Sequence, residues 1–232
     1  MSDQTALPFV GSLLLQSGDQ RTAFVCHAPT LLVTANHKLP DEPETIRWTN
    51  FASGQWRDIE KWVYLVRDHE TDVAILGVEE ELLESALVPA LPPFELRQAV
   101  IDTRYYALVE YNEGGVIEYE WDPGTARIVG SRLKHPNRMK VEASQVTPGC
   151  SGAPLVIDTV CGPIVVGMVS ARYNSQEQWN EHVVWAVHPK ALRRALNRAV
   201  SQRVSNGPAR VSRDFLASLG VDISELPEEL AL

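Results

Sequence analysis

Short runs of strand-forming residues, separated by polar turns, fill most of positions 1 to 190 of this chain. The runs are rich in β-branched, aromatic and leucine residues, which favour strands. They cover residues 9–15, 23–26, 31–34, 62–66 and 73–76, then 105–111, 116–121, 141–145, 153–157, 164–170 and 183–187. Strand and helix patterns do not alternate, which argues against a parallel α/β sheet. We therefore predict an all-β fold.

A proline-containing stretch divides these runs into two halves. Residues 88–98 hold three prolines, and proline cannot donate to a sheet ladder, so we predict a connector there. The predicted organisation is a first β unit over residues 1–88, a linker over 89–98 and a second β unit over 99–188.

A helical pattern follows the second half. Pro189 suits a first helical turn, and Asn206-Gly207-Pro208 ends the pattern. Apolar residues recur every four positions, at Leu192, Leu196, Val200 and Val204. We predict a helix over 189–205 whose arginines form a solvated face, or alternatively an anion site. Residues 206–232 are a tail, either packed on the β units or used for docking and regulation.

Composition and charge argue against nucleic-acid-binding, disulfide-rich, secreted and membrane proteins. The formal net charge is −9, so we expect no nucleic-acid binding, because phosphates would repel the chain. The three cysteines, Cys26, Cys150 and Cys161, are too few and odd in number for a disulfide framework, which favours a reducing compartment. The polar start lacks a secretory signal pattern, and no apolar run has the length of a membrane span. We expect a cytoplasmic protein with no membrane association.

Three motifs carry candidate chemistry, in the order histidine, aspartate, serine. They are Thr34-Ala35-Asn36-His37, Asp72-Val73-Ala74-Ile75-Leu76 and Gly149-Cys150-Ser151-Gly152-Ala153-Pro154. A serine hydroxyl is a poor nucleophile at neutral pH until a histidine removes its proton and a carboxylate orients that histidine. The set predicts hydrolysis by acyl transfer, and a protease above all.

These motifs resemble those of the trypsin-like (chymotrypsin-fold) serine peptidases. The resemblance covers roughly residues 8 to 204, with Asn36, Cys150 and Ala153 as departures from the family pattern. The spacings, 72 − 37 = 35 and 151 − 72 = 79 residues, are compact, as in the short-looped, stand-alone bacterial branch. The resemblance implies two antiparallel β-barrels with the active site in the cleft between them, plus a C-terminal helix.

The resemblance also implies a role for each motif residue. Ser151 would be the nucleophile, and His37 the general base and then the general acid, for which an ordinary histidine pKa of about 6.5 is suited. Asp72 would orient His37. The amides of Gly149 and Ser151 would form the oxyanion hole.

Two nearby acids compete with Asp72 for the orienting role. Asp68 follows an arginine, and Glu70 lies between Asp68 and Asp72 in the sequence. Asp72 is preferred because an apolar strand follows it directly and can bury its carboxylate.

Cys150 stands where self-activating secreted members carry an acid that pairs with a newly cut N-terminus. We therefore expect no activation by N-terminal cleavage. We interpret Cys150 as a small buried residue, with a redox-sensitive thiol as the alternative.

Substrate preference is inferred from the resemblance alone. Gln145, six residues before Ser151, would lie near the base of the primary pocket, and Ser170-Ala171-Arg172 would be the strand edge that binds the substrate backbone. Neutral Gln145 offers no carboxylate to a basic side chain. Arg172 either lines the pocket, where it would attract an acidic side chain, or points to solvent.

The sequence thus favours a narrow-specificity, regulated serine endopeptidase of the bacterial cytosol, associated at the family level with stress or defence. Its partners would be a protein or peptide substrate and a regulatory protein that docks on the tail; no metal and no cofactor are expected. The alternatives are a protease-like binding module and an α/β-hydrolase esterase. The esterase would need parallel βα units and an aspartate and histidine after the serine.

Overall fold

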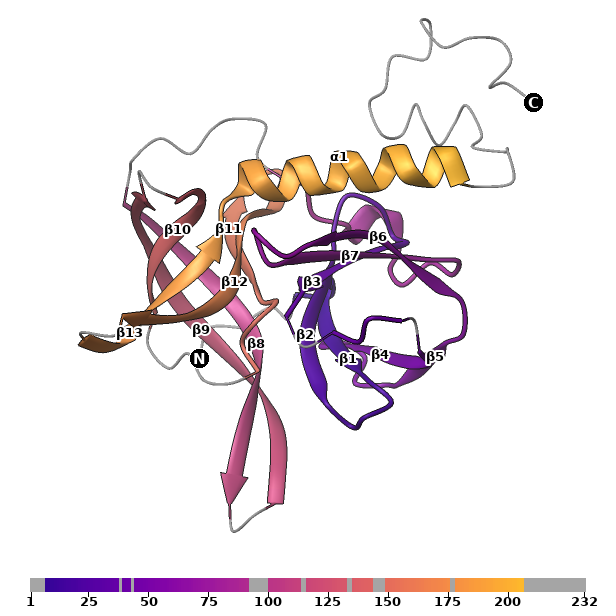
Figure 1. Cartoon of the computed structure of the whole chain (residues 1–232), viewed down its shortest axis with the longest axis horizontal. Helices are drawn as coiled ribbons and strands as arrows, with labels where there is room; N and C mark the ends of the chain where they lie inside the picture. Colours follow the sequence, from indigo (N-terminus) through magenta and orange to yellow (C-terminus); the bar gives the residue numbers. More distant parts are fainter. Residues whose placement is uncertain are drawn as a thin grey trace, which may run out of the picture.

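The computed structural model describes residues 7–37, 39–42, 44–91, 100–113, 116–132, 135–143, 149–175 and 178–206. The chain forms a curled sheet, a closed β-barrel and one C-terminal helix, α1 (Pro189–Asn206), as Figure 1 shows. The described part contains no helix that is both long and apolar enough to cross a membrane.

The N-terminal half is a seven-stranded sheet that curls around its own core (Figure 1). Its spatial order is β5-β4-β1-β2-β3-β7-β6, and neighbouring strands are antiparallel. In chain order the strands are β1 (Val10–Leu14), β2 (Gln20–Val25), β3 (Leu31–Ala35), β4 (Ile46–Asn50), β5 (Arg57–Ile59), β6 (Trp62–Asp68) and β7 (Val73–Val78).

The C-terminal half is a closed barrel in the order β10-β13-β12-β11-β8-β9. Its strands are β8 (Ile101–Glu113), β9 (Val116–Arg132), β10 (His135–Ala143), β11 (Pro154–Thr159), β12 (Gly162–Ser175) and β13 (Gln178–Val187). Strand β8 pairs with β9 along its whole length, and the two extend beyond the barrel as a two-stranded ribbon (Figure 1). A 3-10 turn (Ser85–Leu87) lies between the halves in the sequence.

The predicted fold class, all-β with two antiparallel β-barrels and a C-terminal helix, is confirmed, with the N-terminal barrel present as a curled half-barrel sheet. The antiparallel pairing also excludes the parallel βα units of the esterase alternative. Strands β4 and β5 were not predicted, since they are short and lie among polar turn residues. The exact domain boundaries stay predictions; residues 92–99 of the linker and 207–232 of the tail lie outside the described residues.

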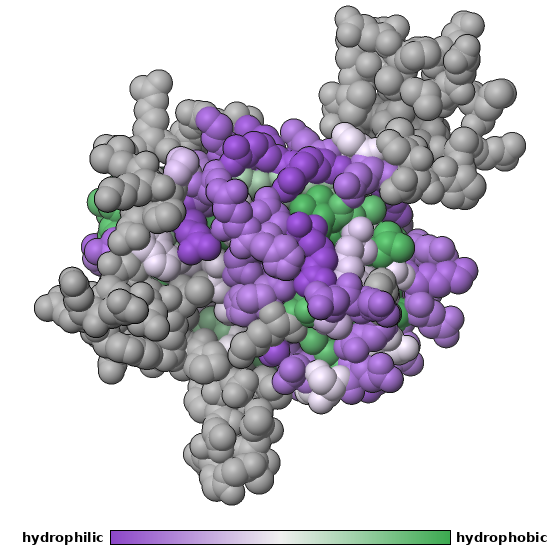
Figure 2. Space-filling view, viewed as in Figure 1, coloured by the Kyte–Doolittle hydropathy of each residue, from purple (hydrophilic) through white to green (hydrophobic). Residues whose placement is uncertain are grey.

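Helix α1 returns from the barrel to the N-terminal sheet. Its predicted apolar stripe is buried there: Leu192 and Leu196 are 1% and 2% exposed and belong to the core of that sheet. Barrel residues such as Tyr106 and Val165 join the same core. Figure 2 shows the outer side of α1 as hydrophilic. One continuous core therefore fixes how the two halves and the helix meet.

Candidate active site

His37 and Asp72 lie side by side because the strands that carry them are neighbours. His37 follows β3, Asp72 precedes β7, and Ala35 pairs with Val73 at that end of the two strands. The His37 Nδ1 atom lies 2.8 Å from Asp72 Oδ2. The His37 backbone amide donates to Asp72 Oδ1, also over 2.8 Å. Both carboxylate oxygens thus hold the histidine.

Asp72 is buried and charged. Burial alone would raise the pKa of its carboxyl, but hydrogen bonds from His37 and from Ser170, and the His37 charge, lower that pKa overall. The Ser170 hydroxyl, on β12 of the barrel, donates to Asp72 Oδ2 over 2.6 Å. An ionised carboxylate in this position can hold the imidazole in one tautomer and stabilise an imidazolium.

The two other candidate carboxylates do not reach His37. Asp68 Oδ1 accepts the backbone amides of Glu70 (3.1 Å) and Thr71 (3.0 Å), so its side chain shapes the turn before Asp72. Glu70 is exposed on that turn. Of the three acids, Asp72 is the one that contacts His37 in the described structure.

Ser151 lies in a glycine-bearing turn that approaches the N-terminal sheet closely. Gly149 and Gly152 have φ values of 99° and 95°, which glycine adopts without steric cost. A Cβ on Gly152 would lie 2.1 Å from the Thr22 carbonyl oxygen. The Gly152 amide donates to the Val169 carbonyl over 2.8 Å, which ties the turn to β12. Cys150 is buried, as predicted for a small packing residue.

Thr22 and Thr34 connect this turn to the strand that leads to His37. The Thr34 hydroxyl donates to the Thr22 carbonyl (2.7 Å), and the Thr22 hydroxyl donates to the Gly149 carbonyl (2.9 Å). Ser151 and His37 share no hydrogen bond in this structure; in enzymes without substrate such bonds are often long and tighten on binding.

The structure describes some of the predicted substrate-binding residues. Ser170 lies on β12 with its side chain on Asp72, a contact that the sequence reading missed. The signal was available: a polar residue in a buried apolar strand generally has a partner. Ala171 and Arg172 continue β12 opposite Trp185 and Val184, and their side chains lie outside the description. Gln145 lies outside the described residues altogether.

A polar network also braces the segment after His37, and the sequence reading missed it too. Arg67 Nε donates to Asn36 Oδ1 (2.9 Å), and its Nη1 atom donates to the Pro40 carbonyl (3.0 Å). The Asn36 side-chain nitrogen lies 2.9 Å from His69 Nδ1. Asn36 is buried, but both polar atoms of its side chain have partners. This departure from the family motif is therefore compatible with the site.

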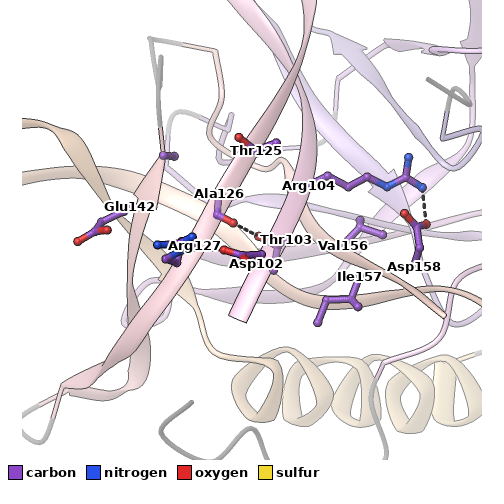
Figure 3. Close-up of a pocket in the computed structure, with 11 residues that line it drawn as sticks. Asp102, Thr103, Arg104, Thr125, Ala126, Arg127, Glu142, Val156, Ile157 and Asp158 are labelled. Carbon is purple, nitrogen blue, oxygen red and sulfur yellow. Dashed lines mark hydrogen bonds and ion pairs between the residues drawn. The ribbon is translucent and has the colours of Figure 1, made fainter. Parts of the chain in front are cut away.

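A hollow in the barrel half lies apart from these residues. It measures about 770 Å³ and is lined by residues of β8, β9, β10 and β11 (Figure 3). Its acids stand near arginines: Asp158 pairs with Arg104, and Asp102 pairs with Arg127 over 2.7 Å. Asp102 first, and Glu142 to a smaller extent, raise the pKa of Arg127. His37, Asp72 and Ser151 do not line it, so we do not assign it to catalysis. Among the described residues, no group of three His, Cys, Asp or Glu is placed to hold a metal ion.

Comparison with known proteins now decides the family. The trypsin-like peptidase domain model matches residues 21–168, well over half of the chain. The chain belongs to the trypsin-like peptidase family. Among solved structures, this trypsin-like peptidase resembles the serine endoprotease from Yersinia pestis, with a TM-score of 0.61 and 16% identity. That match covers 84% of this chain and 64% of the Yersinia chain.

A second solved structure gives the same fold. The Rv3671c protease from M. tuberculosis, in its active form, matches with a TM-score of 0.56 and 18% identity. The match covers 84% of this chain and 82% of that one. A search of curated proteins gives no match. The family match places the chain among the trypsin-like peptidases, and both solved structures share its fold.

Proposed function

We propose that this protein cleaves peptide bonds through an acyl-enzyme on Ser151. The observation that carries the proposal is the double contact of Asp72 with His37, at Nδ1 and at the backbone amide. With Nδ1 donating to Asp72, the other ring nitrogen, Nε2, is left to accept a proton.

In the proposed mechanism, His37 Nε2 takes the proton of the Ser151 hydroxyl as Oγ bonds to the substrate carbonyl carbon. His37 then gives that proton to the departing amine, which leaves an ester on Ser151. A water molecule, deprotonated by His37, then attacks the ester carbonyl carbon. As the bond to Ser151 Oγ breaks and the acid is released, His37 returns this proton to Oγ. Throughout, Asp72 keeps its negative charge and offsets the positive charge on the imidazolium.

The oxyanion hole would consist of the amides of Gly149 and Ser151. The positive φ of Gly149 and the Thr22 hydrogen bond to its carbonyl support this assignment, because they fix the peptide units on either side of Gly149. Each such donor stabilises the transition state by about 3 to 4 kcal/mol.

The substrate would bind as an added strand on β12. Strand β11 pairs with β12 only as far as Met168, and β13 covers the opposite edge. In the described part of the barrel, the edge of residues 170–172 beside β11 therefore has no strand partner. An extended peptide placed there would run past Ser170, next to Asp72.

For the side chain before the cleaved bond, we propose a preference for small, polar or acidic residues over arginine and lysine. Gln145 is neutral, and Arg172 would attract an acid. Glu142 and Asp158 line the separate hollow of the barrel half, where Asp158 pairs with Arg104. Profiling with fluorogenic peptides tests this: a strong preference for arginine would contradict it. If acidic residues are preferred, Arg172→Ala should abolish that preference.

We further propose a regulated, narrow-specificity role in the bacterial cytoplasm, related to stress or defence, with a regulatory protein docking on residues 206–232. The cysteines are few and odd in number, which supports a reducing compartment. Partner capture by the full chain, compared with a chain ending at Asn206, tests the docking role.

A fluorophosphonate probe tests the central proposal directly. Wild type should be labelled on Ser151 and should cleave members of a peptide library, whereas Ser151→Ala should do neither. Labelling and cleavage should both be lost at acid pH, because a protonated histidine cannot act as a base. A folded wild type that takes no label would instead favour a protease-like binding module.

A further inference from the structure

The turn over residues 68–72 delivers Asp72 in an unusual backbone conformation. Asp72 has a φ of 61°, in the left-handed region that few residues other than glycine adopt. Such a conformation persists only where surrounding contacts impose it. The contacts that impose it are therefore part of how the carboxylate reaches His37.

Asp68 supplies several of these contacts, and both of its carboxylate oxygens are used. Oδ1 accepts the amides of Glu70 and Thr71, and Oδ2 accepts a hydrogen bond from Arg198 Nη2 over 2.8 Å. Burial would raise the pKa of Asp68, but the Thr71 amide and side chain and Arg198 together lower it. The turn is thus organised around a charged carboxylate whose outer oxygen is held by the C-terminal helix.

The packing of helix α1 holds the backbone of Arg198 in place. Its neighbours Leu196 and Ala199 are 2% and 0% exposed in the core shared with the N-terminal sheet. Between helix and turn, however, lies a hollow of about 410 Å³ lined by Asp68, Glu70 and Arg198, among others. Polar bonds therefore span a space that apolar packing does not fill.

One further bond reaches the turn from the barrel. Arg138 Nη2, on β10, donates to the Glu70 carbonyl over 3.2 Å.

We propose that Arg198 is a positioning residue for catalysis: by holding Asp68, it fixes the turn that presents Asp72 to His37. The inference rests on the proposed peptidase function. Arg198 touches neither the three motif residues nor the proposed substrate strand; it acts through Asp68. Helix α1 lies beyond the matched residues 21–168, so the family pattern does not supply this role.

Arg194 provides a matched control on the same helix. It lies one turn before Arg198, lines the same hollow and donates to Asn137 rather than to the turn. Arg198→Ala should lower kcat by about 10- to 100-fold, the scale expected when a reacting group is misplaced. Its KM should change by less than about two-fold. Arg198→Lys should recover part of the loss, and Arg194→Ala should keep the wild-type kcat.

Two results would overturn the proposal. One is an equal loss of kcat in Arg194→Ala, which would mean that helix charge alone matters. The other is a normal kcat in folded Arg198→Ala with only a lower Tm, which would mean that the pair is structural.

Asp68→Asn tests the path of the effect. Asparagine keeps an oxygen for the two turn amides but loses the ion pair. If Arg198 acts through Asp68, adding Arg198→Ala to Asp68→Asn should lower kcat by less than about two-fold more. Multiplied losses would show that Arg198 acts by another route.

A readout without turnover separates this proposal from the peptidase function. The proton between His37 Nδ1 and Asp72 should give a far-downfield proton NMR signal. That signal should shift or broaden in Arg198→Ala and stay unchanged in Arg194→Ala. If wild type cleaves nothing, the peptidase proposal fails, and this signal still decides the positioning role; an unchanged signal in Arg198→Ala overturns it.

Discussion

The buried hydroxyl of Thr22 donates a hydrogen bond to the carbonyl oxygen of Gly149, two residues before Ser151, over 2.9 Å. The Thr22 hydroxyl oxygen in turn accepts a hydrogen bond from the Leu108 amide over 2.8 Å. One threonine of the N-terminal sheet therefore contacts two separate segments of the barrel half. Its position sets how the turn of Ser151 faces the strand of His37.

Thr22→Val should both destabilise the protein and reduce activity. Valine has nearly the same shape but leaves a buried carbonyl and a buried amide without partners. The free energy of unfolding should fall by about 2 to 4 kcal/mol. Thr22→Ser keeps the hydroxyl and loses only a methyl, so it should cost about 1 kcal/mol and keep kcat. Urea unfolding and steady-state kinetics check both variants; equal losses would show that packing, not hydrogen bonding, is the cause.

Gly152→Ala should be far more damaging than Gly18→Ala. Both glycines have a positive φ, 95° and 89°, so both changes carry a similar backbone strain of about 1 to 3 kcal/mol. Only Gly152 faces a close backbone oxygen, whereas nothing lies within 4 Å of a Cβ on Gly18. Unfolding free energies should differ by more than about 2 kcal/mol, with turnover lost only in Gly152→Ala. Similar values for the two variants would contradict the close approach seen here.

Asp72→Asn should keep the fold but lower kcat by about 10⁴-fold, the loss known for this change in a related serine protease. Asparagine can present its NH₂ group to Nδ1, which selects the wrong histidine tautomer. Glu70→Gln is the matched control, since Glu70 does not contact His37, and it should keep nearly full activity. Single-turnover kinetics on both variants would reveal a wrong choice of carboxylate.

Ser170→Ala should weaken the protein in a pH-dependent way. The pKa of Asp72 is lowered in the folded state, so its stabilising contribution is present above the unfolded value of about 4 and is lost as pH falls through the folded value. Removing the Ser170 bond to the charged carboxylate should cost about 1.5 to 3 kcal/mol near pH 7. Unfolding measured from pH 7 to 2 should show the two proteins converge at low pH. A constant difference would indicate lost packing instead.

The sequence predicted the fold class and the three motif residues because each depends on a local pattern. Strand-forming runs, the four-residue repeat of the helix and the apolar strand after Asp72 are all visible in one chain. Ser170, Arg67 and Arg198 were harder to assign, because their partners lie far along the chain. The Arg198 bond to Asp68 joins residues 130 positions apart. Among solvated helix arginines, no pattern distinguishes the one that forms it.

The return of α1 to the N-terminal sheet bears on how such a protein could be made safely. His37 and Asp72 leave the ribosome first, Ser151 later, and Arg198 after all three. At about 5 to 20 residues per second, the stretch from Asp72 to Arg198 takes on the order of ten seconds to synthesise. During that interval the nascent chain lacks either its nucleophile or the helix that steadies its aspartate. A peptidase assembled in this order would gain its full activity only after α1 has been synthesised.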